Sequence, residues 1–188
     1  MGAAEQYELL SVAEYLAREE RAETKSEYLN GVVYAMAGGK GRHSQIAANA
    51  LGILHAQLRG KPCRPFNSDM KLRVRLPEQT RFYYPDAMIV CPPIDPDKTY
   101  LDTPSVILEV LSSSTRRTDE GEKKDAYLTI PSLTHYLLAE PEAPVVTVFE
   151  RGEPGFTRTV LQGLDSMVNF PELEAKLPLG ELYEGLEF

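Results

Sequence analysis

Two acidic residues lie beside or within strongly apolar segments, where an ionised side chain needs a partner. Asp86 directly precedes the apolar run 87–91, and Glu109 lies inside the apolar run 106–111. Both runs predict strands, and the run 106–111 predicts one that is covered on both faces, as in the centre of an α/β sheet. Because an unpartnered buried charge is costly, Glu109 requires a cation, a metal ion or a proton beside it.

A metal ion is one partner that would serve both carboxylates. Mg²⁺ is usually held by only one or two carboxylates, together with waters and the phosphates of a substrate. If the two predicted strands belong to one sheet, Asp86 and Glu109 form a candidate site for such a small, oxygen-seeking ion.

A second pattern of polar residues follows the Glu109 strand. Asp119, Lys123 and Tyr127 recur at four-residue spacing, which places them on one face of a helix predicted from 119 to 129. The simpler interpretation is an ordinary Asp–Lys helix pair, which contributes about 0.3–0.5 kcal/mol at an exposed site.

These segments together resemble the Uma-type (DUF820-like) endonuclease family of the restriction-endonuclease-like PD-(D/E)XK superfamily. The resemblance covers residues 10–150 and rests on Tyr84-Pro85-Asp86, 108–117, Asp119-x-x-x-Lys123-x-x-x-Tyr127, 27–39, His43 and 131–133. It implies an α/β fold: a restriction-endonuclease-like α/β/α core with a central mixed sheet, an N-terminal helix and hairpin, and flanking helices.

The resemblance also implies a chemistry and the residues that perform it. The activity would be hydrolysis of phosphodiester bonds in nucleic acid, expected to be DNA, with Mg²⁺ or Mn²⁺ as cofactor. Asp86, Glu109 and the backbone carbonyl of Val110 would hold the metal, and Glu27 would be a third acidic group nearby. A lysine would orient the attacking water and offset negative charge in the transition state.

The identity of that lysine is open, because this chain departs from the superfamily pattern. Leu111 stands where the Glu-x-Lys motif would place a lysine. Lys123 on the following helix is the expected substitute, and Lys71 on the strand 70–76 is the second candidate. A lysine ammonium within about 4–6 Å of the Asp86 and Glu109 carboxylates would support catalysis.

Two other functions remain possible on these residues. The chain could be a catalytically inactive nucleic-acid-binding or interaction protein on the same fold, which the missing motif lysine would explain. Asp86 and Glu109 could also form the acid–base pair of another hydrolase, such as a glycosidase. The absence of tryptophan speaks against a glycosidase, because sugar sites usually contain aromatic platforms.

The charge distribution permits phosphate binding near these motifs. The net charge of −8 is the sum of −4 in residues 1–28, −5 in 163–188 and +1 in 29–162. Five basic residues of the central segment are candidates for contact with nucleic acid: His43, Lys71, Arg73, Arg116 and Arg117. The strand 70–76 alternates apolar residues with Lys71, Arg73 and Arg75, and this pattern predicts a basic outer face. Solvated surface charges, and a lone exposed histidine at 43, are the simpler alternatives.

The remaining periodicities predict the elements that position these groups. A capping box at Ser11 opens a helix over 11–23, and Asn30-Gly31 joins the hairpin strands 26–29 and 32–37. The glycine-rich segment 38–41 opens a long helix that stops at Gly60, and further strands cover 133–139, 145–149 and 156–161. We expect a single domain over 1–188, with the acidic segment 163–188 capping the 10–150 core.

The composition is that of an ordinary globular protein, with 43% hydrophobic and 26% charged residues. No apolar run approaches the ~20 residues that span a bilayer, and the first residues lack a secretory leader, so a cytoplasmic location is expected. Cys91 ends an apolar strand and predicts a buried thiol, since Cys63 and Cys91 have no metal-type spacing. By analogy with enzymes that cut both strands of a duplex, we expect a homodimer.

Overall fold

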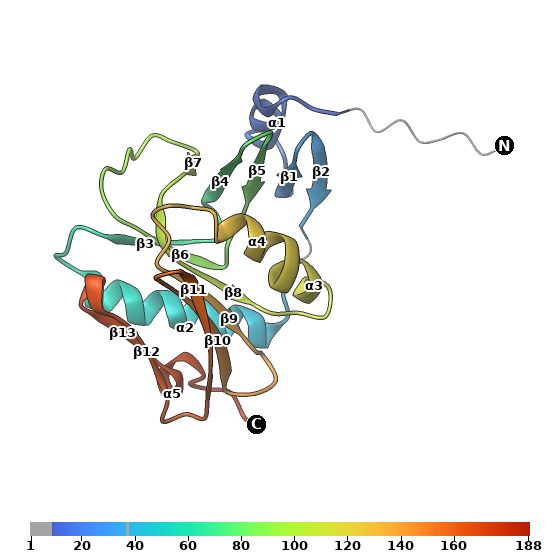
Figure 1. Cartoon of the computed structure of the whole chain (residues 1–188). Coiled ribbons are helices and arrows are strands. Elements are labelled where there is room, and N and C mark those ends of the chain that lie inside the picture. Colours follow the sequence, from blue (N-terminus) through green and yellow to red (C-terminus); the bar gives the residue numbers. More distant parts are fainter. Residues whose placement is uncertain (1–8, 37) are drawn as a thin grey trace.

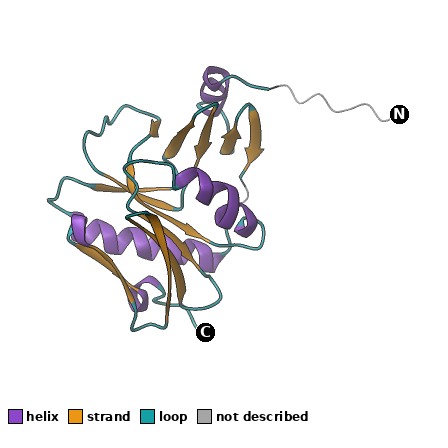
Figure 2. Ribbon diagram, in the orientation of Figure 1, coloured by secondary structure: helices purple, strands orange, loops and turns teal. Residues whose placement is uncertain are grey.

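A six-stranded mixed sheet forms the centre of the protein in a computed structural model that describes residues 9–36 and 38–188 (Figures 1 and 2). Its strand order is β11-β10-β9-β8-β6-β3; β8 and β9 are parallel and the other neighbours are antiparallel. The strands are β3 (Arg64–Asn67), β6 (Ala87–Val90), β8 (Pro104–Val110), β9 (His135–Ala139), β10 (Val145–Gly152) and β11 (Gly155–Gln162).

Helices cover both faces of this sheet, as the resemblance implied. The long helix α2 (Gly41–Leu58) packs on one face, together with β12 (Met167–Phe170), β13 (Ala175–Pro178) and α5 (Leu179–Leu182). A continuous helical segment packs on the other: α3 (Arg116–Thr118), the π-helical turn η1 (Asp119–Lys123) and α4 (Lys124–Tyr127). Strand β8 divides its side chains between these layers, because successive residues point to opposite faces.

That alternation places Glu109 on one definite side of the sheet. Val106, Leu108 and Val110 belong to the apolar cluster beneath α2. Ile107 and Leu111 belong to the opposite cluster, which contains Tyr127 of α4. Glu109 therefore faces the helical segment 116–127 rather than α2.

A second, five-stranded sheet carries the N-terminal hairpin. Its order is β2-β1-β5-β4-β7, with β1 (Ser26–Leu29), β2 (Val32–Ala35), β4 (Lys71–Leu76), β5 (Gln79–Tyr83) and β7 (Tyr100–Leu101). Asn30 and Gly31 adopt φ angles of 49° and 99°, which form the tight turn that the Asn-Gly pair predicted. Helix α1 (Val12–Glu19) packs on this sheet through Tyr15, which is fully buried against Tyr28 and Phe82.

Several predicted boundaries were wrong. Helix α1 ends at Glu19 rather than at 23, and β2 ends at Ala35; residue 37 lies outside the described residues. Strand β4 belongs to the second sheet and has no uniformly basic outer face, since Lys71 is only 7% exposed. The helix predicted from 119 to 129 starts at 116, ends at 127 and contains the π-helical turn.

The prediction of a free buried thiol at Cys91 was also wrong. Cys63 precedes β3 and Cys91 follows β6, and the antiparallel register pairs Arg64 with Val90. The two cysteines are therefore adjacent, and they form a disulfide.

The segment 163–188 contributes to the interior rather than only to the surface. Its hairpin and α5 bury Val168, Phe170, Leu177 and Leu182 in the cluster that also contains Leu54 of α2. None of the helices in the described part of the chain has the length and apolarity needed to cross a membrane.

Candidate active site

Asp86 and Glu109 meet because their strands are antiparallel neighbours. Ala87 pairs with Leu108, so the residues just beyond this pair lie side by side. The backbone N–H of Asp86 donates to Glu109 Oε2 at 3.3 Å, and the N–H of Val110 donates to Asp86 Oδ2 at 2.7 Å. These two hydrogen bonds fix both carboxylates at the end of β6, as the sequence predicted for strands of one sheet.

Lys123 reaches the same point from the helical layer. Its ammonium nitrogen lies 2.8 Å from Glu27 Oε1, 3.5 Å from Glu109 Oε1 and 3.6 Å from Asp119 Oδ1. The side chain is 7% exposed, so this is a buried cluster rather than an ordinary surface helix pair. Of the two candidate lysines, Lys123 is the one whose ammonium lies within the expected distance of the Glu109 carboxylate.

Three carboxylates surround this one lysine, and the carboxylate of Asp86 lies beside Glu109, so like charges are crowded together in the cluster. Burial raises the pKa of Glu109 well above its usual range; the Lys123 ammonium opposes this shift, and the carboxylates of Asp119, Asp86 and Glu27 reinforce it. Burial likewise raises the pKa of Asp119 against the opposing effect of Lys123. Burial alone would lower the pKa of Lys123, but the carboxylates of Glu109, Glu27 and Asp119 outweigh burial and raise it.

His43 joins the cluster from the first turn of α2, so the alternative of a lone exposed histidine was wrong. His43 Nε2 lies 2.8 Å from Asp86 Oδ1, and this hydrogen bond raises the pKa of His43 despite partial burial. Its second ring nitrogen, Nδ1, is buried and has no hydrogen-bond partner among the described residues. A side chain at Gly39 would meet the imidazole at 2.7 Å, so the glycine lets the ring pack in this position.

Two further side chains of the site were in the sequence pattern but were not predicted as site residues. The hydroxyl of Tyr127 donates to Glu109 Oε1 at 3.0 Å. Asp119 is 2% exposed, and Tyr136 holds its backbone carbonyl at 2.9 Å. The i, i+4, i+8 spacing indicated their shared face, and only the packing of that face against Glu109 shows that both belong to the cluster.

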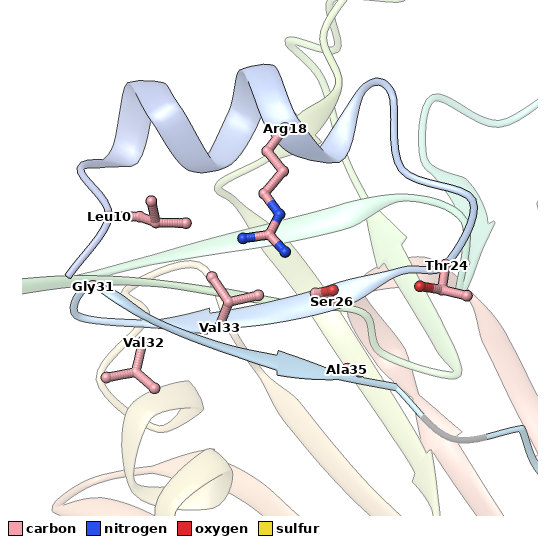
Figure 3. A pocket seen from close by; sticks show the side chains of 8 residues that line it. All are labelled: Leu10, Arg18, Thr24, Ser26, Gly31, Val32, Val33 and Ala35. Atoms are coloured by element: carbon pink, nitrogen blue, oxygen red, sulfur yellow. The ribbon is translucent and has the colours of Figure 1, made fainter. Parts of the chain in front are cut away.

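Five residues of the cluster line a cavity of about 660 Å³, and we call the surface that they form its floor: His43, Asp86, Glu109, Asp119 and Lys123. The glycine-rich segment 38–41, Arg42 and Tyr84 line one part of it, and the segment 109–116 lines another. A second cavity, of about 370 Å³, lies between α1 and the β1–β2 hairpin (Figure 3). Arg18 is the one charged residue among the eight described residues that line this second cavity, which contains none of the predicted site residues.

Most of the basic residues predicted to contact nucleic acid already have protein partners. Arg73 binds both oxygens of Asp102, at 2.6 and 2.9 Å. Arg116 binds both oxygens of Glu140, at 2.7 and 2.6 Å. Lys71 is buried above the ring of Tyr84, whereas Arg117 is exposed and does not line the large cavity.

The donor atoms suit a hard cation, although they do not form a complete protein cage. No group of three or more His, Cys, Asp or Glu side chains within 9–36 and 38–188 is arranged to hold a metal ion. Asp86 and Glu109 nevertheless offer oxygen donors at the floor of an open cavity, in a cluster with excess negative charge. That set fits Mg²⁺, which keeps several waters and is bound through one or two carboxylates.

Comparison with known proteins agrees with this architecture. Two uncharacterized proteins of Synechocystis sp., sll1609 and slr1290, are 32% and 30% identical to the chain over 166 and 180 residues. These alignments cover 86% and 95% of the chain, and 93% and 94% of the relatives. The crystal structure of "a putative nuclease belonging to DUF820" from Anabaena variabilis has the same fold, with a TM-score of 0.74 and 19% identity over 93% of this chain and 97% of that one.

One family model matches a range of the chain that includes all the residues of the candidate site. The model of the Uma2 family, described as "Putative restriction endonuclease", matches residues 12–180. That range includes Glu27, His43, Asp86, Glu109 and Lys123. The protein therefore belongs to the Uma2 family.

Proposed function

We propose that the protein is a metal-dependent endonuclease that hydrolyses phosphodiester bonds of nucleic acid, with DNA as the expected substrate. The observation that carries this proposal is the position of the Lys123 ammonium, which lies 3.5 Å from Glu109 Oε1. The carboxylate of Asp86 lies beside Glu109, because it accepts a hydrogen bond from the backbone N–H of Val110. A lysine beside two carboxylates at the floor of an open cavity is the combination that the superfamily chemistry requires. The description of the family, and that of the Anabaena protein, support a nuclease in general terms.

The metal would be Mg²⁺ or Mn²⁺, held by the carboxylates of Asp86 and Glu109 with the carbonyl of Val110. When bound, such an ion supplies an activated water and stabilises charge on the phosphate oxygens. A cation there would also offset the two causes that raise the pKa of Glu109, which are burial and, to a lesser extent, repulsion from neighbouring carboxylates.

The protein's own groups would position the reacting atoms. The Lys123 ammonium would donate hydrogen bonds to the attacking water or to a phosphate oxygen, and its positive charge would offset the charge that builds there. Glu27 and Asp119 hold this ammonium in place, and the hydroxyl of Tyr127 orients Glu109. His43 orients the other metal-binding carboxylate, that of Asp86, through the hydrogen bond between them.

A second candidate function is a nucleic-acid-binding protein of the same fold that does not cut. The observation that favours it is the pairing of Lys123 with three carboxylates, which leaves its ammonium partly committed within the protein. If the protein does cut both strands of a duplex, we propose that it acts as a homodimer, because each strand then has its own site.

Calorimetric titration of Mg²⁺ and Mn²⁺, with plasmid cleavage on the same samples, tests the proposal. The wild type should bind and cut, whereas Asp86→Asn should lose both activities and remain folded. Asp97→Asn, in an exposed loop, is the matched control and should behave as wild type. Metal binding without cleavage of DNA or RNA would favour the second candidate, and no binding at all would contradict both the metal site and the nuclease.

A further inference from the structure

Arg42, the second residue of α2, lines the large cavity and has three contacts with other segments of the protein. One guanidinium nitrogen donates to the carbonyl of Glu187 at 2.7 Å, and another to the carbonyl of Pro141 at 3.5 Å. The guanidinium also stacks over the ring of Phe188, 5.4 Å from its centroid. The contacts of this side chain therefore come from segments that are distant in the sequence. Arg42 itself directly follows the glycine-rich segment 38–41, which lines the same cavity.

The charge of Arg42 is not neutralised by these contacts. Both of its hydrogen-bond partners are neutral backbone carbonyls, and no carboxylate of the described residues lies within ion-pairing distance. Arg73 and Arg116 differ in this respect, because two guanidinium nitrogens of each donate hydrogen bonds to the two oxygens of one carboxylate. A guanidinium has five N–H donors, so Arg42 keeps donors as well as charge for a ligand.

The position of Arg42 relative to the acidic cluster indicates what that ligand would be. Arg42 lines the same cavity as Asp86 and Glu109, and its neighbour His43 contacts Asp86 directly. A phosphodiester strand that approaches this floor meets several carboxylates, so it needs a compensating cation nearby. Guanidinium matches phosphate in both charge and fork geometry, whereas the exposed Lys40 at the same cavity can act only as a point charge.

We propose that Arg42 is an anchor for a backbone phosphate of the nucleic acid strand, next to the phosphate that the acidic cluster would cleave. This inference rests on the proposed function for the identity of the ligand. It assigns substrate positioning to a residue outside the acidic cluster and outside the basic residues that the sequence suggested.

Binding of nucleic acid without cleavage tests the anchor. A short fluorescein-labelled DNA duplex would be titrated by anisotropy at several salt concentrations, in EDTA and again in Ca²⁺. The variants are Arg42→Gln, Arg42→Lys and the matched control Arg59→Gln, which removes the same charge from the exposed C-terminal end of α2. Thermal melting of each variant verifies that it is folded.

The anchor predicts a specific salt signature. Arg42→Gln should weaken binding about tenfold, as expected for loss of a charged hydrogen bond. It should also reduce the slope of log K against log salt by about one, because one phosphate contact is lost. Arg42→Lys should restore the slope and part of the affinity, and Arg59→Gln should match the wild type.

The outcomes separate this inference from the proposed function. If Arg42→Gln binds with wild-type affinity and slope while the wild type cuts plasmid, the anchor is wrong and the nuclease stands. If the Arg42-dependent slope is present but the wild type never cuts, the anchor stands and the nuclease is wrong. A wild type that binds neither DNA nor the equivalent RNA duplex would overturn the anchor as well.

Discussion

The ammonium nitrogen of Lys123 lies 2.8 Å from Glu27 Oε1, a contact that joins the π-helical turn η1 to strand β1 of the second sheet. The N–H of Tyr84 donates to the same oxygen at 3.4 Å, just before the Asp86 position. Glu27 therefore connects the lysine to the segment that supplies the first carboxylate. This arrangement brings a lysine from a helix to Glu109, although Leu111 stands at the position of the motif lysine.

Replacing the lysine should affect both stability and activity. Lys123→Met leaves several buried carboxylates without their cation, which should lower the free energy of unfolding by about 3 kcal/mol in metal-free buffer. Plasmid cleavage should be lost, because the ammonium beside Glu109 would no longer offset the transition-state charge. Denaturant unfolding and a cleavage assay measure the two effects, and Lys124→Met is the matched control, since Lys124 pairs with the exposed Asp125 rather than with the buried cluster. A Lys123→Met protein that cuts at the wild-type rate would exclude the assigned role.

Removing the most strongly shifted carboxylate should have the opposite effect on stability. Burial raises the folded-state pKa of Glu109 above its unfolded value, so the folded protein retains the proton longer as pH rises. Glu109 therefore contributes favourably to the free energy of unfolding at low pH. This contribution is lost as pH rises from the pKa of the unfolded state through the pKa of the folded state. Glu109→Gln should abolish cleavage, raise stability at neutral pH and flatten the loss of stability with rising pH.

Denaturant unfolding between pH 5 and pH 8, about the range above an unperturbed Glu pKa, checks this prediction. Glu142→Gln, which changes an exposed residue that lines the same cavity, is the control and should leave the pH dependence unchanged. A Glu109→Gln protein that is less stable than the wild type at neutral pH would identify the carboxylate as a structural partner of Lys123 instead.

The disulfide between Cys63 and Cys91 makes a separate prediction about stability. It closes a loop across a sequence separation of 28 residues, which corresponds to about 3–4 kcal/mol in the chain-entropy description. The double variant Cys63→Ala/Cys91→Ala should lose that amount in denaturant unfolding and still bind metal. Disulfides are rare in reducing compartments, so this bond also bears on the predicted cytoplasmic location. Protein taken directly from cells would be unfolded and its free thiols titrated. Two titratable thiols in that unfolded protein would contradict the bond.

The sequence predicted the parts of the site that depend on local pattern. Apolar runs identified the strands of Asp86 and Glu109, and helical spacing identified the face of Lys123. Contacts set by strand register were not predictable in the same way. The pairing of Leu72 with Leu101 places Asp102 beside Arg73, and the pairing of Arg64 with Val90 brings the two cysteines together. Neither register leaves a signal in the local sequence, because the paired segments are joined by long connections.

Leu111 provides a final test of how the lysine substitution works. Its N–H donates to the carbonyl of Ala139 at 2.9 Å, so the extended pairing of β8 with β9 continues one residue past Val110. A side chain at 111 therefore shares the face of Glu109, and Leu111 both lines the large cavity and belongs to the apolar cluster of Tyr127. A lysine at 111 could reach the carboxylates that Lys123 now serves.

The expected result depends on whether Lys123 is present. Leu111→Lys alone should be destabilising, because it adds a second buried ammonium and removes apolar packing. In the Lys123→Met background the same change should raise stability above that of Lys123→Met and recover part of the cleavage, since it returns one cation to the carboxylates. Unfolding measurements and cleavage assays on the two single variants and the double variant form a double-mutant cycle that measures this coupling. Additive losses in the cycle would mean that the two positions are not coupled, and that a lysine at 111 cannot replace the ammonium of Lys123 beside the carboxylates.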